Sequence, residues 1–285
     1  MKINLRAGRP EDAEVAGRIC YEAFKTIAEK HNFPRDFPDV ETAVGLTTML
    51  LSRPDIYSVV AELDGEIVGS NFLWEGNQVS GVGPITIDPK VQDSSIGRRL
   101  MEDVIRRSDE KGFSSIRLIQ AAYHNRSLSL YTKLGFNPNE PVSGIGGEAL
   151  NIKIDGFDVR PMTESDLPEA NDLTLKIHGH TRLQDLRDGI GQKSAFVVER
   201  HGRITGYTTA LGIFGHTVGE TNEDLKAIIG AAPAILGPGF LLPTRNAEVL
   251  RWCLENGLRI IQPMTLMSRG LYQEPRGAFM PSVLF

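Results

Sequence analysis

A short polar segment around residue 95 has the composition of an anion-binding loop. Gln92, Asp93, Ser94, Ser95 and Gly97 follow the apolar run VGPITID. From about Gly97 onward, apolar residues recur at helical spacing, which predicts a helix with one buried face. The N–H groups and the dipole at a helix N-terminus favour a bound phosphate. Serines that only cap the helix, and solvated arginines at positions 98 and 99, would give the same pattern.

This segment belongs to an ordered series of strands and helices in the first half of the chain. YSVVAEL and EIVGSNFLW flank Asp64-Gly65, a dipeptide typical of two-residue hairpin turns. The strand-like runs VSGVGPITID and SSIRLIQAA follow, and the helical run SLSLYTKLGF ends at Gly135. Strands that alternate with helices after an initial hairpin predict a mixed α/β domain.

The second half of the chain repeats the same order. Arg160 repeats Arg6 ahead of a polar helix start, and FVVER and RITGYTTAL flank His201-Gly202 as a second hairpin. FLLPTRNAEVLRWCLENGL repeats the strand, the helix and the closing glycine. We therefore predict two tandem domains, over residues 1–150 and 151–285. The second copy is shorter before and after its hairpin, and such deletions fall mainly on loops.

Composition excludes several classes of protein. The net charge of −5 gives no electrostatic support for a nucleic-acid partner. No run of about 18 apolar residues is present, and the first residues lack the apolar core of a secretory signal. Cys20 and Cys253 are the only cysteines, which suggests a reducing compartment and no disulfide framework. We expect a cytoplasmic protein with no membrane or nucleic-acid partner.

Two motifs in the first half resemble those of the GNAT superfamily of acyl-CoA-dependent N-acyltransferases. The segment from Gln92 to Gly97 matches a motif of Gln or Arg, two residues, Gly, one residue, then Gly or Ala, with Ser95 at the middle Gly. His124, Ser127, Tyr131 and Gly135-Phe136 match the second motif, with His124 at its Asn position and Asn125 displaced by one. The resemblance covers residues 1–150 and implies a mixed-sheet α+β fold, used here as two tandem GNAT-like domains.

The resemblance also implies where acetyl-CoA binds. In this family the pantetheine arm lies along the strand before the loop, here Gly83 to Ile87, where Pro84 implies a bulge or an edge. A backbone N–H near Ile85 or Ile87 would then polarise the thioester carbonyl. The expected cofactor-binding residues are Ile85, Thr86, Ile87, Gln92, Asp93, Ser94, Ser95, Ile96, Gly97, Arg98, His124, Asn125, Ser127 and Tyr131.

Tyr131 is the expected general acid in this resemblance. Attack of an amine on the thioester expels a thiolate, which a phenol of pKa about 10 can protonate. A half-buried aromatic residue without a catalytic role is the alternative. The sequence does not identify the general base: Glu75 at the end of a hairpin strand is the named candidate. The others are Asp36, Asp88, Glu148, His31, His124 and a chain of water molecules.

The proline-broken segment 31–56 is expected to form the acceptor pocket. Phe33, Asp36 and Phe37 combine aromatic rings with a carboxylate, which suits a cationic amine. A surface loop with two packed phenylalanines is equally compatible with these residues. The HGH run at 178–180 has no third ligand nearby in sequence, so we expect no metal site.

The second copy lacks the residues that would carry the chemistry. When Gly257 is aligned with Gly135, Asn246 stands at the position of His124 and Cys253 at that of Tyr131. The segment GHTVGETNEDLKAII also lacks the phosphate motif. We predict a degenerate GNAT-like domain that keeps the fold without binding the cofactor.

The predicted function is transfer of an acetyl group from acetyl-CoA to a primary amine of a small molecule or to an amino group. A non-catalytic acyl-CoA sensor and a structural protein with two decayed copies are the alternatives. A sensor would bind the cofactor without turnover, and a structural protein would not bind it. The sequence specifies neither the acceptor nor the oligomeric state.

Overall fold

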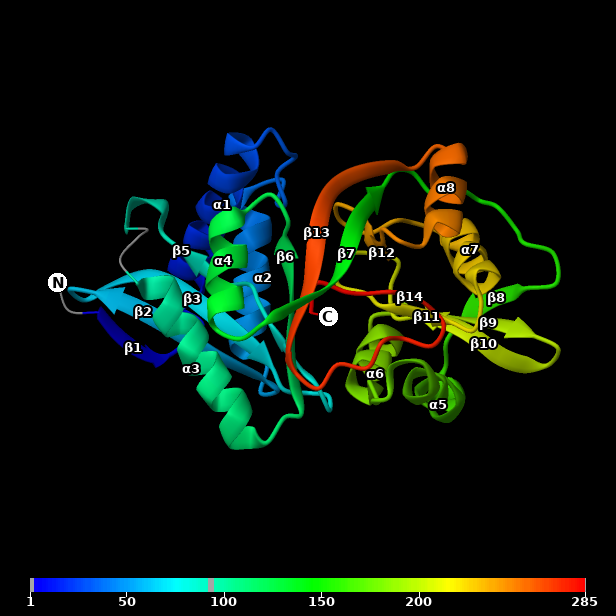
Figure 1. The fold of residues 1–285 in the computed structure, drawn as a ribbon, viewed down its shortest axis with the longest axis horizontal. Coiled ribbons are helices and arrows are strands. Elements are labelled where there is room, and N and C mark those ends of the chain that lie inside the picture. Colours follow the sequence, from blue (N-terminus) through cyan, green and yellow to red (C-terminus); the bar gives the residue numbers. More distant parts are fainter. Residues whose placement is uncertain (1–2, 92–94, 285) are drawn as a thin grey trace. The chain divides into compact units, whose positions relative to one another are not determined.

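The computed structural model describes residues 3–91 and 95–284. They divide into two compact units. Unit 1 comprises Met1–Leu118 and Tyr123–Phe136, and unit 2 comprises Ile119–Ala122 and Asn137–Phe285. Figure 1 shows both units as helices packed on strands. No helix among the described residues has the length and apolar character needed to cross a bilayer.

The strands of unit 1 form a mixed sheet. Their order is β1 (Ile3–Ala7), β2 (Ile56–Leu63), β3 (Glu66–Trp74), β4 (Ser80–Val82) and β6 (Ser115–Ala121), and the short β5 (Thr86–Ile87) pairs with β3. Only the β4–β6 pair among these is parallel. Asp64 and Gly65 form the predicted hairpin turn, with φ of 53° and 94°.

Helices cover both faces of this sheet. They are α1 (Ala13–Lys30), α2 (Val40–Ser52), α3 (Ile96–Lys111) and α4 (Asn125–Lys133), with short 3₁₀ turns at Pro10–Asp12 and Pro89–Val91. Phe72 packs against Leu50 of α2, whereas the Asn71 amide reaches the Leu100 carbonyl of α3. Since successive residues of a strand point to opposite faces, α2 and α3 lie on opposite sides of β3.

The segment 31–56 is more regular than the sequence suggested. Its centre is helix α2, whose N-cap Asp39 accepts a hydrogen bond from the Thr42 backbone N–H at 2.8 Å. Pro34, Pro38 and Pro54 all lie outside this helix. The prolines therefore delimit a helix, and the irregular part is limited to the connections on either side.

Unit 2 contains two groups of strands. One sheet has the order β14 (Ala278–Met280), β11 (Thr217–Gly219), β10 (Arg203–Thr208), β9 (Phe196–Arg200) and β8 (Asp158–Pro161). In the other group, β12 (Phe240–Pro243) and β13 (Arg259–Gly270) both pair with β7 (Asn137–Gly146). The helices are α5 (Leu167–His178), α6 (Leu183–Gly191), α7 (Asn222–Ala231) and α8 (Ala247–Glu255), after a 3₁₀ turn at Glu164–Asp166.

Equivalent side chains make the same contacts in both copies of the repeat. Arg6 forms a two-pronged ion pair with Asp12 at 2.7 and 2.9 Å, and Arg160 binds Asp166 in the same way at 2.8 Å. Both arginines also bind a glutamate on the next strand, Glu62 or Glu199. The two closing glycines, at 135 and 257, have the same φ of 89°. This agreement supports the duplication inferred from the sequence.

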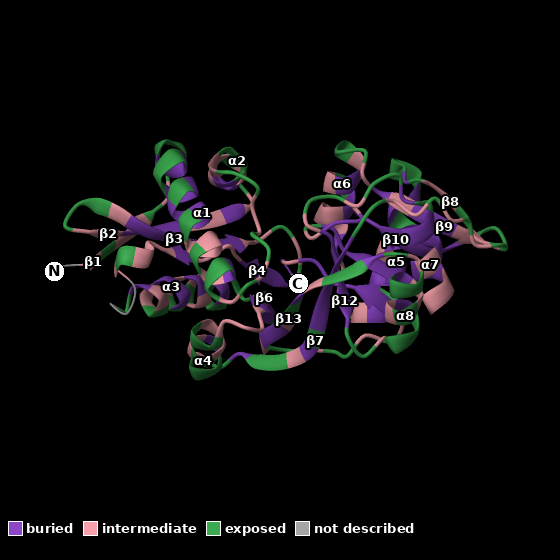
Figure 2. Ribbon diagram, turned by 90° about the horizontal axis from the view of Figure 1, so that it is seen from above, coloured by how far each residue is buried: buried purple, intermediate pink, exposed green. Residues whose placement is uncertain are grey.

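One strand of the first copy belongs structurally to the second unit. β7 follows α4 in sequence, yet it pairs antiparallel with β12 through Phe240–Ile145 and with β13 through Met264–Val142. The boundary between the two compact units therefore falls after Phe136, whereas the boundary between the two sequence repeats falls near residue 150. Figure 2 shows that buried residues line the strands of both units while the outer helix faces are exposed.

Candidate active site

The ladder between β4 and β6 opens after two residue pairs. Ser80 pairs with Ile116 and Gly81 with Arg117, and then the chain turns through Gly83 and Pro84. The next strand, β5, pairs with β3 through Ser70–Thr86 and Gly69–Ile87 instead of with β6. The break expected around Pro84 is therefore present, and it leaves one edge of β5 unpaired by any described strand.

One backbone donor of β5, the Ile87 N–H, points toward this open edge. The Asp88 N–H donates to the Val68 carbonyl of β3 at 2.8 Å. Successive N–H groups of a strand point to opposite sides, so the Ile87 N–H is directed away from β3. The side chain of the neighbouring Thr86 points into the core, where its hydroxyl lies 3.3 Å from the Ser70 hydroxyl. Ile87 is thus placed to donate to a ligand that lies along β5.

The N-terminus of α3 adjoins the same edge. The helix begins at Ile96, as the apolar spacing predicted, and Ser95 is its N-cap with a φ of 66° and no side-chain capping bond. A Cβ added at Gly97 would lie 3.1 Å from Ile87 Cδ1 and 3.6 Å from Leu130 Cδ2. Glycine at 97 therefore allows β5, α3 and α4 to meet closely.

Several residues expected to bind phosphate have other partners or cannot be placed. Gln92, Asp93 and Ser94 lie outside the described residues. The Arg98 guanidinium pairs with Glu102 at 3.2 Å, and that of Arg99 donates to the Ile3 carbonyl at 2.8 Å. In the described part of the loop, the expected donors are therefore the backbone N–H groups at the start of α3.

Tyr131 is buried in α4, and its side chain is 7% exposed. Its carbonyl accepts from the Phe136 N–H at 3.0 Å, and within residues 3–91 and 95–284 its phenol makes no hydrogen bond. Burial raises the pKa of the phenol above its ordinary value. The group therefore stays protonated at neutral pH, as a proton donor to a thiolate requires.

The other motif residues of α4 occupy its first turn. His124 is the N-cap, and its carbonyl accepts from the Ser127 N–H at 3.1 Å and from the Ser127 hydroxyl at 2.9 Å. Its imidazole makes no capping hydrogen bond. Asn125, the displaced asparagine, is exposed at the first helical position. Burial lowers the pKa of His124, and Arg126, His31 and Lys30 lower it further.

An aromatic cluster lies beside this turn. Phe33 stacks on Tyr123 with ring centroids 4.2 Å apart, and His31 lies 5.5 Å from the same ring. Burial raises the pKa of Tyr123 to about 12, with a contribution from the Asp36 charge. Phe37 turns elsewhere and packs edge-on against Phe24 at 5.5 Å. Phe33 and Asp36 are thus brought together near His124, whereas Phe37 contacts α1.

Tyr123 was absent from the residues predicted for the site. Its only sequence signal is its place between the strand SSIRLIQAA and the helix that carries Tyr131. A residue at the end of a central strand is well placed for a site in mixed α/β folds, but that position alone does not identify a contact with Phe33.

Glu75 has a structural partner that argues against its role as the general base. Its two carboxylate oxygens accept from Arg107 of α3 at 2.7 and 3.0 Å, and Lys111 lies 4.0 Å away. The Arg107 guanidinium also lies over the ring of Tyr57 at 4.9 Å. Because both oxygens already bind a guanidinium, the carboxylate joins the end of β3 to α3.

The equivalent helix of unit 2 carries a buried thiol in place of the phenol. Cys253 occupies the place of Tyr131, and its carbonyl accepts from the Leu258 N–H at 3.0 Å, as that of Tyr131 does from Phe136. The thiol is fully buried, and burial raises its pKa to about 12. Asn246 caps α8 through the Val249 N–H at 3.3 Å and donates to Asn222 at 2.8 Å.

A carboxylate occupies the N-terminus of α7, the counterpart of α3. Asp224 accepts from the Thr221 N–H and hydroxyl at 2.8 Å, and from the Thr205 hydroxyl at 2.5 Å. It is completely buried. A phosphate at the start of α7 would be repelled by the charge of this carboxylate.

The C-terminal strand β14 fills the space beside β11. In unit 1 the counterparts of β11 and β12 pair directly, but in unit 2 these strands belong to different sheets. β14 pairs with β11 through Val218–Phe279 and contacts β12 on its other side. Ala278 and Met280 pack in the core with Phe240 and Leu242. A segment of the chain itself thus lies where unit 1 has its open edge.

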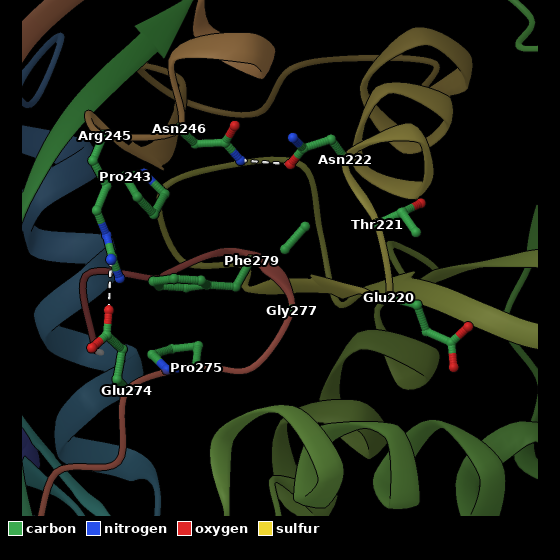
Figure 3. Close-up of a pocket in the computed structure, with 11 residues that line it drawn as sticks. Glu220, Thr221, Asn222, Pro243, Arg245, Asn246, Glu274, Pro275, Gly277 and Phe279 are labelled. Carbon is green, nitrogen blue, oxygen red and sulfur yellow. Dashed lines mark hydrogen bonds and ion pairs between the residues drawn. The ribbon is translucent and has the colours of Figure 1, made fainter.

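A cavity of about 460 Å³ remains next to β14 (Figure 3). Figure 3 shows the Phe279 ring along one wall and the Arg245–Glu274 ion pair at one side. Its polar side chains bind each other or neighbouring groups, as Asn246 does with Asn222. The lining residues are Glu220, Thr221, Asn222, Pro243, Arg245, Asn246, Glu274, Pro275, Gly277, Ala278 and Phe279.

Known proteins with related sequences and folds agree with this arrangement. Residues 19–136 match the model of the acetyltransferase (GNAT) family. An IAA acetyltransferase from Azospirillum brasilense is 27% identical over 129 residues, which are 44% of this chain and 84% of that protein.

Two solved structures share the fold over almost the whole length. A candidate acetyltransferase from Pyrococcus horikoshii has a TM-score of 0.73 at 18% identity, covering 97% of this chain and 94% of that one. A tandem GNAT protein from the clavulanic acid biosynthesis pathway has a TM-score of 0.56 at 12% identity, covering 94% and 98%. The matched segment, the repeated strand order and this likeness together show a GNAT-like acetyltransferase fold, with two GNAT-like domains in tandem.

Proposed function

We propose that the first domain transfers an acetyl group from acetyl-CoA to a primary amine of a small molecule or to an amino group. The observation that carries the proposal is the meeting of three elements at Gly97. The open edge of β5, the N-terminus of α3 and the helix that bears Tyr131 lie within van der Waals reach there. These three elements offer a donor to the thioester carbonyl, N–H groups to the pyrophosphate and a phenol to the leaving thiolate.

Each element has one chemical task in this proposal. The pantetheine arm lies along β5 as an added strand, and the Ile87 N–H donates to the thioester carbonyl as negative charge develops on its oxygen. Backbone N–H groups at the start of α3 bind the pyrophosphate. Tyr131 protonates the CoA thiolate as it leaves. Phe33, Asp36 and Tyr123 form one side of the acceptor site and suit a cationic amine.

The second domain has no cofactor in this proposal. Asp224 places a buried carboxylate at the start of α7, where it accepts from Thr221; β14 fills the space beside β11, and Cys253 replaces the phenol. Both cysteines are buried free thiols, which is compatible with the reducing cytoplasm where acyl-CoA is made and used.

Calorimetric titration of acetyl-CoA into the intact chain tests this assignment. We expect one site per chain, and no detectable site in Gly97→Asp, whose side chain would enter the junction and add negative charge. Gly45→Asp is the matched control, because a Cβ at Gly45 on α2 meets nothing within 4 Å. Two sites in the wild type, or one in Gly97→Asp, would contradict a silent second domain.

A panel of primary amines then separates an enzyme from a sensor. Phenethylamine, putrescine and glycinamide differ in aromaticity and charge, and release of CoA thiol reports transfer. Transfer to any of them supports the enzyme. Binding of acetyl-CoA without transfer to these or further amines would favour an acyl-CoA sensor, a reading that the replacement of the loop glycine by Ser95 keeps open.

A further inference from the structure

Acetyl transfer needs a group that removes a proton from the acceptor ammonium, since an amine of pKa about 10 is almost fully protonated at pH 7. With Glu75 bound to Arg107, the acceptor side of unit 1 offers few groups for this task. His124 lies at the start of α4, between the aromatic cluster and the helix that carries Tyr131. It is half-buried, so solvent and a ligand can both reach it.

His124 and Tyr131 share one face of α4. They are seven residues apart, which is close to two full turns, or about 10 Å along the axis. Side chains on a helix lean toward its N-terminus, so the Tyr131 phenol extends from its own position toward the His124 end of the helix. A thioester at the phenol and an amine at the imidazole would therefore lie on the same side of the helix.

The local structure leaves the imidazole outside the helix cap. The His124 carbonyl and the Ser127 side chain complete the first turn, and the ring makes no capping hydrogen bond to α4. The charges that act on the ring are those of Arg126 on α4 and of Lys30 and His31 at the end of α1. The cations among them disfavour a second positive charge and keep the imidazole neutral, as a proton acceptor must be.

We propose that His124 is the general base that deprotonates the acceptor amine. The proposal rests on the acetyltransferase function given above. The imidazole takes one proton from the ammonium, and the nitrogen lone pair then forms the C–N bond to the thioester carbon. The C–S bond breaks with its electron pair on sulfur, which takes the Tyr131 proton. The second proton of the new amide nitrogen restores Tyr131, and His124 passes its proton to solvent, so each turnover releases one proton.

His124→Gln is the primary variant, because glutamine is polar and of similar length but does not take up a proton. We expect kcat/KM for the best amine of the panel to fall about 10²-fold or more at pH 7, the usual contribution of a general base. The Kd for acetyl-CoA should stay unchanged. The deficit should shrink as the pH approaches about 10, where the amine loses its proton unaided. Added imidazole should restore part of the rate to His124→Ala.

Two matched variants control the experiment. His31→Gln removes an imidazole that lowers the pKa of His124, so it should keep the general base but shift the pH profile toward higher pH. His201→Gln makes the same change in the hairpin of unit 2 and should leave both the rate and the pH profile unchanged. The proposal is overturned if His124→Gln keeps the wild-type rate, or if its deficit is constant across pH. It is equally overturned if the loss lies in acetyl-CoA affinity alone, which would make His124 a cofactor contact.

Failure of the proposed function would look different. A wild-type chain that binds no acetyl-CoA removes the enzyme and its base together, whereas turnover that survives in His124→Gln removes only the base. If the wild-type chain binds acetyl-CoA but transfers the acetyl group to no amine, His124 is not a general base and the protein is an acyl-CoA sensor.

Discussion

Ser95 adopts a left-handed backbone conformation that glycine tolerates and other residues adopt at a cost. Its φ is 66°, at the position where the family motif has glycine. We predict that Ser95→Gly stabilises the chain by up to about 1 kcal/mol, because the cost of left-handed backbone exceeds the entropy lost by glycine on folding. The midpoint of urea unfolding measures this change.

Ser129→Gly is the control for that prediction. It places glycine inside the exposed face of α4, where a right-handed helix gives glycine no advantage. It should destabilise the chain by about 0.5 kcal/mol. If both variants lower the free energy of unfolding, the left-handed backbone at Ser95 carries no strain that glycine relieves.

Tyr131 should matter for turnover and hardly at all for cofactor affinity. Tyr131→Phe removes the buried proton donor, so we expect kcat to fall about 10²-fold or more, with the acetyl-CoA Kd nearly intact. Tyr57→Phe is the control: its hydroxyl binds Asp103 of α3 at 2.7 Å, a contact that affects stability. Thiol release under saturating acetyl-CoA gives both rates, and an unchanged rate in Tyr131→Phe would remove the phenol from the mechanism.

At the scale of single elements, α7 and α2 begin with caps of different strength. Asp224 is buried and accepts three hydrogen bonds, one of them from the buried Thr205 hydroxyl. Asp224→Ala should therefore cost about 2–3 kcal/mol, since a buried hydroxyl loses its partner along with the cap. Asp39→Ala at the exposed start of α2 should cost only about 1 kcal/mol. Equal losses in denaturant unfolding would contradict a special role for Asp224.

Hairpins and helix ends are the elements that the sequence specifies best. Asp64-Gly65 and His201-Gly202 form the predicted turns, and α3 begins where the apolar spacing starts. These features depend on nearby residues, so local composition is enough to predict them. Helix α2 was missed because its prolines suggested an irregular segment although they lie outside the helix.

The pairing partner of a strand cannot be predicted from the local sequence pattern. An alternating or apolar run predicts a strand, but it contains no information on which edge that strand will pair with. The pairing of β7 with β12 and of β14 with β11 therefore became visible only in the structure. The contact of Phe33 with Tyr123, and the ion pair that occupies Glu75, likewise join residues far apart in sequence.

For the whole molecule, acid should reduce stability in two stages. His216 is fully buried with its ring 2.6 Å from the Tyr207 hydroxyl, and burial holds its pKa well below 6.5. Below pH 6.5 the unfolded chain binds a proton there that the folded chain does not, so stability falls as the pH falls. The expected slope is about 1.4 kcal/mol per pH unit from His216, and His124 adds to it with the same sign.

The second stage involves carboxylates. Arg203 lowers the pKa of Glu220 from 4.5 to about 2, and Arg160 lowers that of Asp166. Their contribution is complete above their ordinary pKa values and is lost as the pH falls below them. Urea midpoints measured from pH 3 to pH 8 should show both stages, and His216→Gln should flatten only the upper one. Urea midpoints that stay constant between pH 5 and 6.5 would contradict a neutral, buried His216 imidazole in the folded chain.

The strand β14 also bears on the history of the duplication. A slot occupied by Ala278–Met280 cannot hold a cofactor at the same time, so the two states exclude each other sterically. We propose that, once β14 lay beside β11, substitutions at the start of α7 no longer affected catalysis and were no longer under selection for activity. Under this proposal, β14 is a segment of the chain itself in the place where the first domain is proposed to bind the pantetheine arm along β5.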